Sequence, residues 1–134
     1  MATVSIGAHA APWYTEAGIA TQGYDPVAYF SEGRAVRGDV DFHYKWDGVT
    51  WLFASAANRD TFAAEPEKYA PQYGGHCSMA MAGGKKSRGS GEAWSIQNGK
   101  LYLNGNTDVR DRWLLDPSKY IARADDWWPR VKDD

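Results

Sequence analysis

Residues 42–53 read Phe-His-Tyr-Lys-Trp-Asp-Gly-Val-Thr-Trp-Leu-Phe, which is the clearest structural signal in the chain. Aromatic side chains alternate with His43 and Lys45 before the Asp47-Gly48 pair, and large apolar residues alternate again after it. This period of two is typical of a half-buried strand, and Asp-Gly favours a tight turn between antiparallel strands. The stretch therefore predicts a β-hairpin that turns at residues 47–48.

A second hairpin is predicted around Asn98-Gly99. Residues 93–96 read Ala-Trp-Ser-Ile before this pair, and residues 101–103 read Leu-Tyr-Leu after it. Asn-Gly suits a type I′ turn, because both central residues of that turn need positive φ. We expect the two hairpins to form one sheet. The residues expected in the core are Phe42 or Trp46, Trp51, Phe53, Phe62, Trp94, Leu101, Leu103 and Trp113.

Short helices are predicted between and after the hairpins. Each is expected to begin at a side chain that can accept hydrogen bonds from the first free backbone N–H groups, and proline is favoured at the first helical position. The expected capping residues are Asp25, Ser55, Thr107 or Asp108, and Asp116. A separate last turn is expected at residues 125–129. Together these elements predict a small single α+β domain, in which two antiparallel β-hairpins pack with short helices.

The length of 134 residues suits one domain with one core. Residues 1–22 are mostly small and polar, and we expect them to form an N-terminal arm that Trp13 and Tyr14 attach to the domain of residues 23–134. Seven Trp and eight Tyr supply large side chains for the core. One cysteine excludes an internal disulfide and a multi-cysteine zinc site.

The charge and hydropathy of the chain exclude some partners. A net charge of −2 gives no electrostatic support for a nucleic-acid partner or an anionic membrane. No apolar run approaches the roughly 20 residues that cross a bilayer, so no membrane insertion is expected. The chain is expected to be periplasmic if a signal peptide was removed before Met1, and cytoplasmic otherwise. The sequence identifies no protein partner.

Residues 69–84 concentrate the reactive side chains of the chain. Cys77 lies between two glycine pairs, next to His76 and close to Met79 and Met81. Thiolate, thioether and imidazole groups suit copper, and Mg²⁺ or Ca²⁺ would instead require oxygen ligands. The spacing predicts a soft-metal site for a copper ion at Cys77, completed by some of His76, Met79, Met81 and His43.

Two alternatives to the metal site stay open at this point. Free cysteine is often a small buried hydrophobe, so Cys77 could be a structural core residue of a module that binds a protein or another ligand. The third class is a thiol enzyme with Cys77 as nucleophile. It needs a base, which His76, His43 or His9 would have to supply, and no catalytic signature accompanies it.

Four pieces of the chain, taken in order, resemble the YHS domain family, in its branch of small stand-alone proteins. The pieces are residues 23–30 (Gly-Tyr-Asp-Pro-Val-Ala-Tyr-Phe), residues 53–62 (Phe-Ala-Ser-Ala-Ala-Asn-Arg-Asp-Thr-Phe), residues 66–77 (Pro-Glu-Lys-Tyr-Ala-Pro-Gln-Tyr-Gly-Gly-His-Cys), and Ala93-Trp94 with residues 101–104 (Leu-Tyr-Leu-Asn). The resemblance covers about residues 23–130. Some YHS domains are attached to heavy-metal transport ATPases, which implies metal handling.

The chain departs from the metal-associated members of that family. Those members resemble Asp-Pro-Val-Cys-Gly-Met in the first motif and Phe-Cys-Ser-x-x-Cys in the second, and the cysteine positions are here Ala28, Ala54 and Ala57. A cysteine-rich site of that kind is therefore excluded. The stand-alone branch instead has a cysteine after the Gly-Gly pair, where Cys77 lies. The resemblance assigns no role to the neighbouring histidine and methionines.

Overall fold

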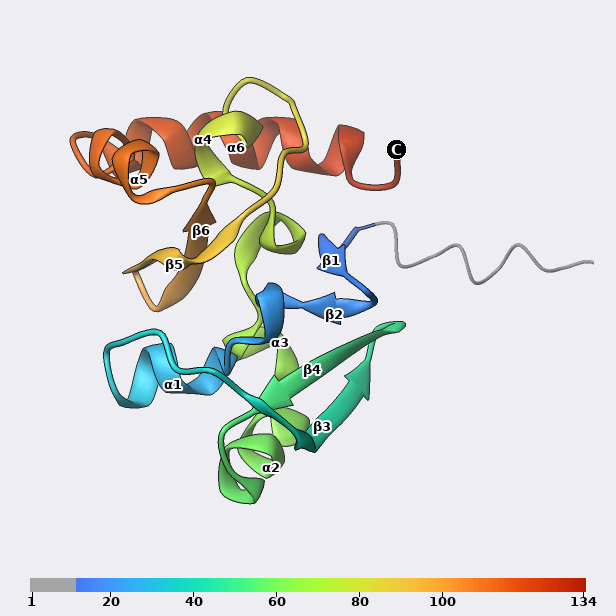
Figure 1. The fold of residues 1–134 in the computed structure, drawn as a ribbon. Helices are drawn as coiled ribbons and strands as arrows, with labels where there is room; N and C mark the ends of the chain where they lie inside the picture. Colours follow the sequence, from blue (N-terminus) through green and yellow to red (C-terminus); the bar gives the residue numbers. More distant parts are fainter. Residues whose placement is uncertain (1–11) are drawn as a thin grey trace, which may run out of the picture.

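The structure is a computed structural model, and it describes residues 12–134. The described part contains helices and short antiparallel hairpins, which confirms the α+β class (Figure 1). The elements are β1 (Thr15–Glu16), β2 (Ile19–Ala20), η2 (Thr21–Gly23), α1 (Pro26–Ser31), β3 (Asp39–Trp46), β4 (Val49–Phe53), α2 (Ala56–Ala64), α3 (Pro66–Tyr69), η3 (Gln72–Gly75), α4 (Ser78–Met81), β5 (Ser90–Gln97), β6 (Lys100–Asn104), α5 (Thr107–Trp113) and α6 (Pro117–Val131).

Both predicted hairpins are present, but they lie in different sheets. One sheet has the strand order β1-β2-β4-β3, and among the described residues β5 pairs only with β6. Figure 1 places the two hairpins in opposite halves of the molecule, with α3 between them. The expectation of a single sheet was wrong because β4 finds its second neighbour in β2, where Ile19 pairs in parallel with Thr50. That pairing joins distant segments, and local alternation carries no information about it.

Both hairpins turn at the predicted residues. Asp47 and Gly48 have φ values of 52° and 81°, and Asn98 and Gly99 have 52° and 77°. Positive φ at both central residues is the requirement of a type I′ turn, whose twist matches that of the flanking strands. The sequence prediction for both turns is confirmed.

The core lies in three clusters of buried side chains. Trp51, Phe53 and Phe62 are fully buried in the half that contains the four-stranded sheet. Trp113 packs on Tyr102 in a second cluster. The third cluster is formed by Tyr24, Tyr29, Leu101 and Leu103. Most of the expected core is therefore confirmed, with the exception that the side chains of Phe42, Trp46 and Trp94 are only partly buried.

Three of the four predicted helix starts are confirmed by side-chain hydrogen bonds. Asp25, Ser55 and Asp116 each accept a bond from a backbone N–H in the first turn of α1, α2 and α6. Helix α5 begins one residue earlier than expected, since Asn106 Oδ1 accepts from Val109 N at 2.8 Å. Asparagine is as good a capping residue as aspartate, so the prediction differs from the structure only in the residue at which the helix begins.

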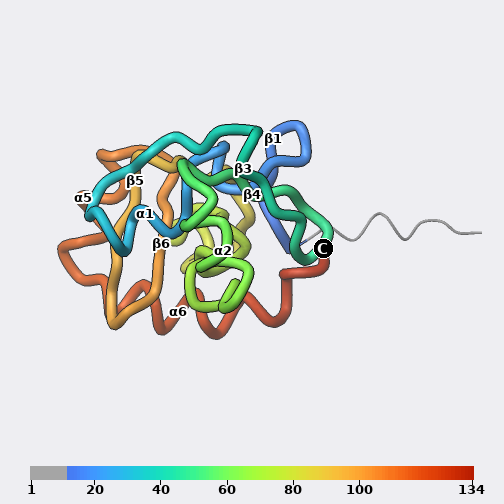
Figure 2. Tube along the Cα trace, turned by 90° about the horizontal axis from the view of Figure 1, so that it is seen from below, coloured from blue at the N-terminus to red at the C-terminus, as the bar shows by residue number. Residues whose placement is uncertain are grey.

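Helix α6 continues through residues 125–129, where a separate turn was expected. Pro129 lies inside this helix, two residues before its end at Val131. A proline there removes one backbone donor, and burial of Ala124 with packing of Trp128 against the second core cluster holds the helix together. Figure 2 shows α6 as one continuous helical coil along the molecule.

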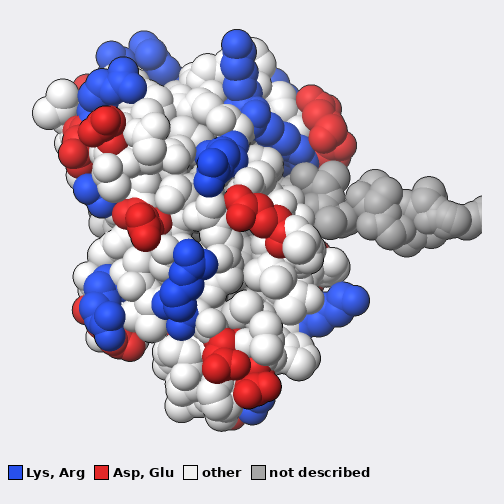
Figure 3. Space-filling view, in the orientation of Figure 1, with Lys and Arg blue, Asp and Glu red and all other residues white. Residues whose placement is uncertain are grey.

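The described part of the N-terminal arm contacts the domain through both predicted aromatics. Trp13 packs against the rings of Trp46 and Trp51, and Tyr14 N donates to Gly74 O at 2.8 Å. The division of the chain at residue 22 stays a prediction. On the face drawn in Figure 3, basic and acidic side chains are interspersed. None of the described helices has the length and apolarity needed to cross a membrane.

Candidate functional site

The segment before Cys77 makes the sharp turn that its glycines predict. Tyr73, Gly74 and Gly75 have φ values of 55°, 61° and 79°, all in the left-handed region. A side chain at position 74 would also collide with the backbone carbonyl of Pro12. Glycine is therefore required at 74 for both conformation and space. The turn carries the chain from η3 into α4, and Cys77 is the residue before α4 begins.

The thiol of Cys77 is buried against the end of β6. Its Sγ donates a long hydrogen bond of 3.6 Å to Asn104 Oδ1, and only 5% of the residue is exposed. The same Oδ1 accepts from Met79 N at 2.9 Å. Asn104 is completely buried, and its Nδ2 has no hydrogen-bond partner among the described residues. The thiol thus lies beside a carboxamide whose hydrogen-bonding capacity is incompletely used.

A groove of about 460 Å³ opens beside this thiol, and we call it the thiol groove. Both Cys77 and Met79 line it, and Met79 also packs, partly buried, against the second core cluster. Arg88 and Arg112 line the same groove. Arg88 lies 4.0 Å from Glu16, and Arg112 has no ion pair within residues 12–134. The groove therefore combines soft sulfur donors with positive charge.

The side chain of His76 lies among aromatic rings. Its ring centroid is 5.9 Å from that of Tyr14 and 6.0 Å from that of Trp128. The residue is 7% exposed, and neither ring nitrogen has a hydrogen-bond partner in the described part of the chain. Burial lowers the pKa of His76 to about 4, with a smaller contribution from the nearby Lys86 ammonium. The imidazole is therefore neutral near pH 7, the form that binds metals.

The structure separates the other two predicted ligands from the thiol groove. Met81 is completely buried in the cluster that contains Tyr102 and Trp113. His43 is exposed on β3, and its Nδ1 lies 2.8 Å from Val40 O. Figure 1 places β3 and α4 at opposite ends of the molecule. Within residues 12–134, no group of three or more His, Cys, Asp or Glu side chains is placed to hold a metal ion. His9 lies outside the described residues.

The positions that carry cysteine in metal-associated YHS domains surround a carboxylate here. Asp25 is completely buried, and it accepts hydrogen bonds from the backbone N–H groups of Ala28 at 3.3 Å and Ala54 at 2.9 Å. Asn58, which follows Ala57, donates to the same carboxylate. This region of the chain is a hydrogen-bond network between α1 and α2.

Comparison with protein families identifies one part of this architecture. The model of the YHS domain matches residues 27–73, from α1 to η3. The chain therefore contains a YHS domain over these residues. The matched part of the YHS domain ends before His76 and Cys77, so the thiol groove lies beyond it. Comparisons with curated proteins and with solved structures found no significant match.

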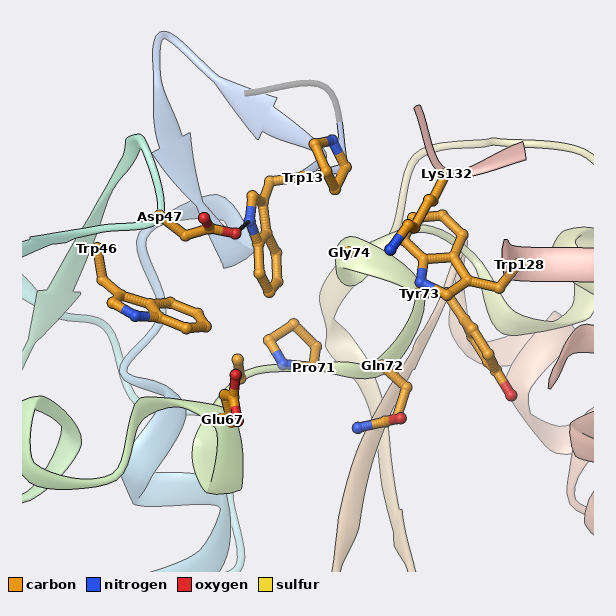
Figure 4. Close-up of a pocket in the computed structure, with 12 residues that line it drawn as sticks. Trp13, Trp46, Asp47, Glu67, Pro71, Gln72, Tyr73, Gly74, Trp128 and Lys132 are labelled. Carbon is orange, nitrogen blue, oxygen red and sulfur yellow. Dashed lines mark hydrogen bonds between the residues drawn. The ribbon is translucent and has the colours of Figure 1, made fainter. Parts of the chain in front are cut away.

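Sequence reasoning missed two features around these sites. Asn104 and Arg112 come from the end of β6 and from α5, and their approach to Cys77 depends on how those elements fold back. A second cleft lies between the N-terminal segment, the β3–β4 turn and the end of α6 (Figure 4). Trp13, Trp46 and Trp128 meet there from distant parts of the chain. The seven tryptophans of the sequence were the available signal.

Proposed function

We propose that this YHS domain-containing protein binds a soft metal ion, Cu(I), at Cys77, and that Met79 supplies the second sulfur ligand. The observation that carries the proposal is that both residues line the thiol groove. Thiolate and thioether groups are soft ligands that suit Cu(I). The occurrence of YHS domains on heavy-metal transport ATPases supports the same class of function.

The polar surroundings of the thiol favour this assignment. The hydrogen bond from Cys77 to Asn104 is 3.6 Å long, so little interaction energy is lost when the thiol gives up its proton to a metal. Arg88 and Arg112 line the same groove and add positive charge to it. His76 has a neutral imidazole and is next to Cys77 in sequence. Because its ring is packed against other aromatic rings, we assign it only an auxiliary role as a ligand.

Met79 and Met81 give the proposal an internal control. Residues two apart on a helix face different directions, and here Met79 lines the groove while Met81 is completely buried. Both are unbranched thioethers of the same size. A substitution by leucine removes the sulfur at either position with a small change in volume. Only the change at Met79 is expected to affect the metal.

The test is a competition for Cu(I) between the reduced protein and a chromogenic chelator such as bicinchoninate. Wild-type protein should retain one Cu(I) per chain, Cys77→Ser should lose it, and Met79→Leu should hold it more weakly. Met81→Leu and His43→Gln should compete like the wild type. Equal copper retention by wild type and Cys77→Ser would overturn the proposal.

The burial of Cys77 and its bond to Asn104 favour one competing interpretation, in which this cysteine is a structural core residue of a binding module. That interpretation expects Cys77→Ala to lower the stability of the fold and no variant to change copper retention. A thiol enzyme is less well supported. The polar partner of Sγ is a carboxamide oxygen, which is not a base, and a thiol nucleophile needs one.

A further inference from the structure

The cleft of Figure 4 is separate from the thiol groove, and we call it the tryptophan cleft. It has a volume of about 570 Å³, which lies within the range of small-molecule sites. Its walls come from four parts of the chain: the segment before β1, the β3–β4 turn, the stretch from α3 to η3, and the end of α6. The side chains that the argument uses are Trp13, Trp46, Asp47, Glu67, Trp128 and Lys132.

The walls of the cleft are held in place without a ligand. Trp13 Nε1 donates to Asp47 Oδ2 at 2.7 Å, which is the dashed line of Figure 4. The Trp13 ring also packs at 5.5 Å from Trp46, with the planes tilted by 60°. On the other wall, the bond between Tyr14 N and Gly74 O fixes the N-terminal segment against η3. A preformed site loses less conformational entropy when it binds.

Charges of opposite sign lie at the two ends of the cleft. Figure 4 places Asp47 and Glu67 on the side of Trp46, and Lys132 on the side of Trp128. None of these three charged side chains forms an ion pair within residues 12–134. The Lys86 ammonium lies 5.8 Å from the centre of the Trp128 ring, and it donates to Lys132 O at 2.6 Å and to Asp134 O at 3.1 Å, so it ties the end of the chain to this wall.

The aromatic side chains suit a cation at the negative end. Indole rings attract ammonium groups through their electron-rich faces, and tryptophan is the best of the side chains in this respect. The hydrogen bond from Trp13 to Asp47 polarises that indole further, because its donor N–H faces a carboxylate. The positive end instead suits a carboxylate, which Lys132 can bind.

We infer that the tryptophan cleft binds a small zwitterion of the betaine or amino-acid class. Its ammonium group lies beside Trp13 and Trp46 near Asp47 and Glu67, and its carboxylate lies at Lys132. A molecule with a cation alone would leave Lys132 unpaired in the occupied cleft, and an anion alone would approach two carboxylates. The zwitterion satisfies both ends, and the polar lining holds it in one orientation.

The experiment is isothermal titration calorimetry of the full chain with glycine betaine, choline and a neutral sugar. Choline has the trimethylammonium group of glycine betaine and lacks its carboxylate. Wild-type protein should bind glycine betaine, bind choline about tenfold more weakly, and give no heat with the sugar. No heat with glycine betaine, equal affinity for choline, or tighter binding of the sugar would each overturn the inference.

Charge-removing variants assign the two ends. Glu67→Gln should weaken the binding of glycine betaine and of choline alike, and Lys132→Gln should weaken the binding of glycine betaine alone. Glu32→Gln and Lys100→Gln remove exposed charges that do not line the cleft, and they should bind like wild type. Cys77→Ser should also bind glycine betaine normally, so this result is independent of copper. Unchanged binding in both Glu67→Gln and Lys132→Gln would contradict the assignment.

Discussion

The carboxylate of Asp25 accepts a 2.7 Å hydrogen bond from Asn58 Nδ2, and this contact joins the start of α1 to α2. Asp25 also accepts from the backbone N–H groups of Val27, Ala28 and Ala54, and it is completely buried. One side chain therefore caps a helix and connects it to the segment that follows β4. The same residues surround the positions where metal-associated YHS domains have cysteines.

Asp25→Ala should therefore be one of the most destabilising substitutions in the chain. It leaves several buried donors without an acceptor, and each such donor costs about 1–3 kcal/mol, so a loss of about 3 kcal/mol or more is expected. The free energy of unfolding in urea measures it. Asp60→Ala on the exposed face of α2 should change stability by no more than about 0.5 kcal/mol. Similar losses in the two variants would show that the network contributes little.

The second prediction concerns the turn between β5 and β6. Gly99 has a φ of 77°, and no atom lies within 4 Å of where a Cβ would be placed. The cost of Gly99→Val is therefore purely one of backbone conformation, because a β-branched residue is strained at positive φ. We expect a loss of about 1–3 kcal/mol in the free energy of unfolding. Gly83→Ala is the control, since position 83 has no positive φ, and it should be neutral or slightly stabilising.

The sequence predicts those features of the fold whose signals are local. The turns at Asp47-Gly48 and Asn98-Gly99, and the caps at Asp25, Ser55 and Asp116, depend on residues within a few positions, and all are present. The parallel pairing of Ile19 with Thr50 was missed because it joins segments about 30 residues apart, between which no local pattern exists.

The candidate site was only partly predictable for the same reason. The position of Cys77 between glycine pairs is visible in the sequence, and the turn it predicts is present. Which methionine lines the thiol groove depends on how α4 packs: Met79 lines the groove and Met81 is completely buried, while both contact the second core cluster. Asn104 contacts the thiol from β6, and the tryptophan cleft joins both ends of the described chain. Such juxtapositions follow from tertiary structure alone.

His76 should make the stability of the metal-free fold depend on pH. Its folded pKa of about 4 lies below its ordinary value of 6.5, so the unfolded chain binds more protons between these values. Stability should therefore be full above about pH 6.5 and should fall as the pH is lowered toward 4. Between pH 7 and pH 5 the expected contribution of this residue is about 2 kcal/mol.

The measurement is urea unfolding at pH 7 and at pH 5, with a chelator present, for wild type and for His76→Phe. Phenylalanine keeps an aromatic ring beside Tyr14 and Trp128 and has no proton to bind. The groups of other elements that face His76 are Tyr14, Trp128, Lys86 and the backbone of Ser87, and they are common to both proteins. The loss on acidification should be smaller in His76→Phe. The same loss in both proteins would assign the pH dependence to other groups.

The last prediction concerns how copper binding depends on pH. A thiol must lose its proton before it binds a metal, so Cu(I) and a proton compete for Cys77. The apparent affinity should rise by about tenfold per pH unit until the thiol is ionised, which is the signature of one released proton.

Met79 binds through a thioether, which has no proton to release. Met79→Leu should therefore weaken binding equally at every pH and leave the slope unchanged. Chelator competition across the pH range measures both curves. A flat profile for wild type would remove the thiolate from the proposed site, whatever the affinity at a single pH.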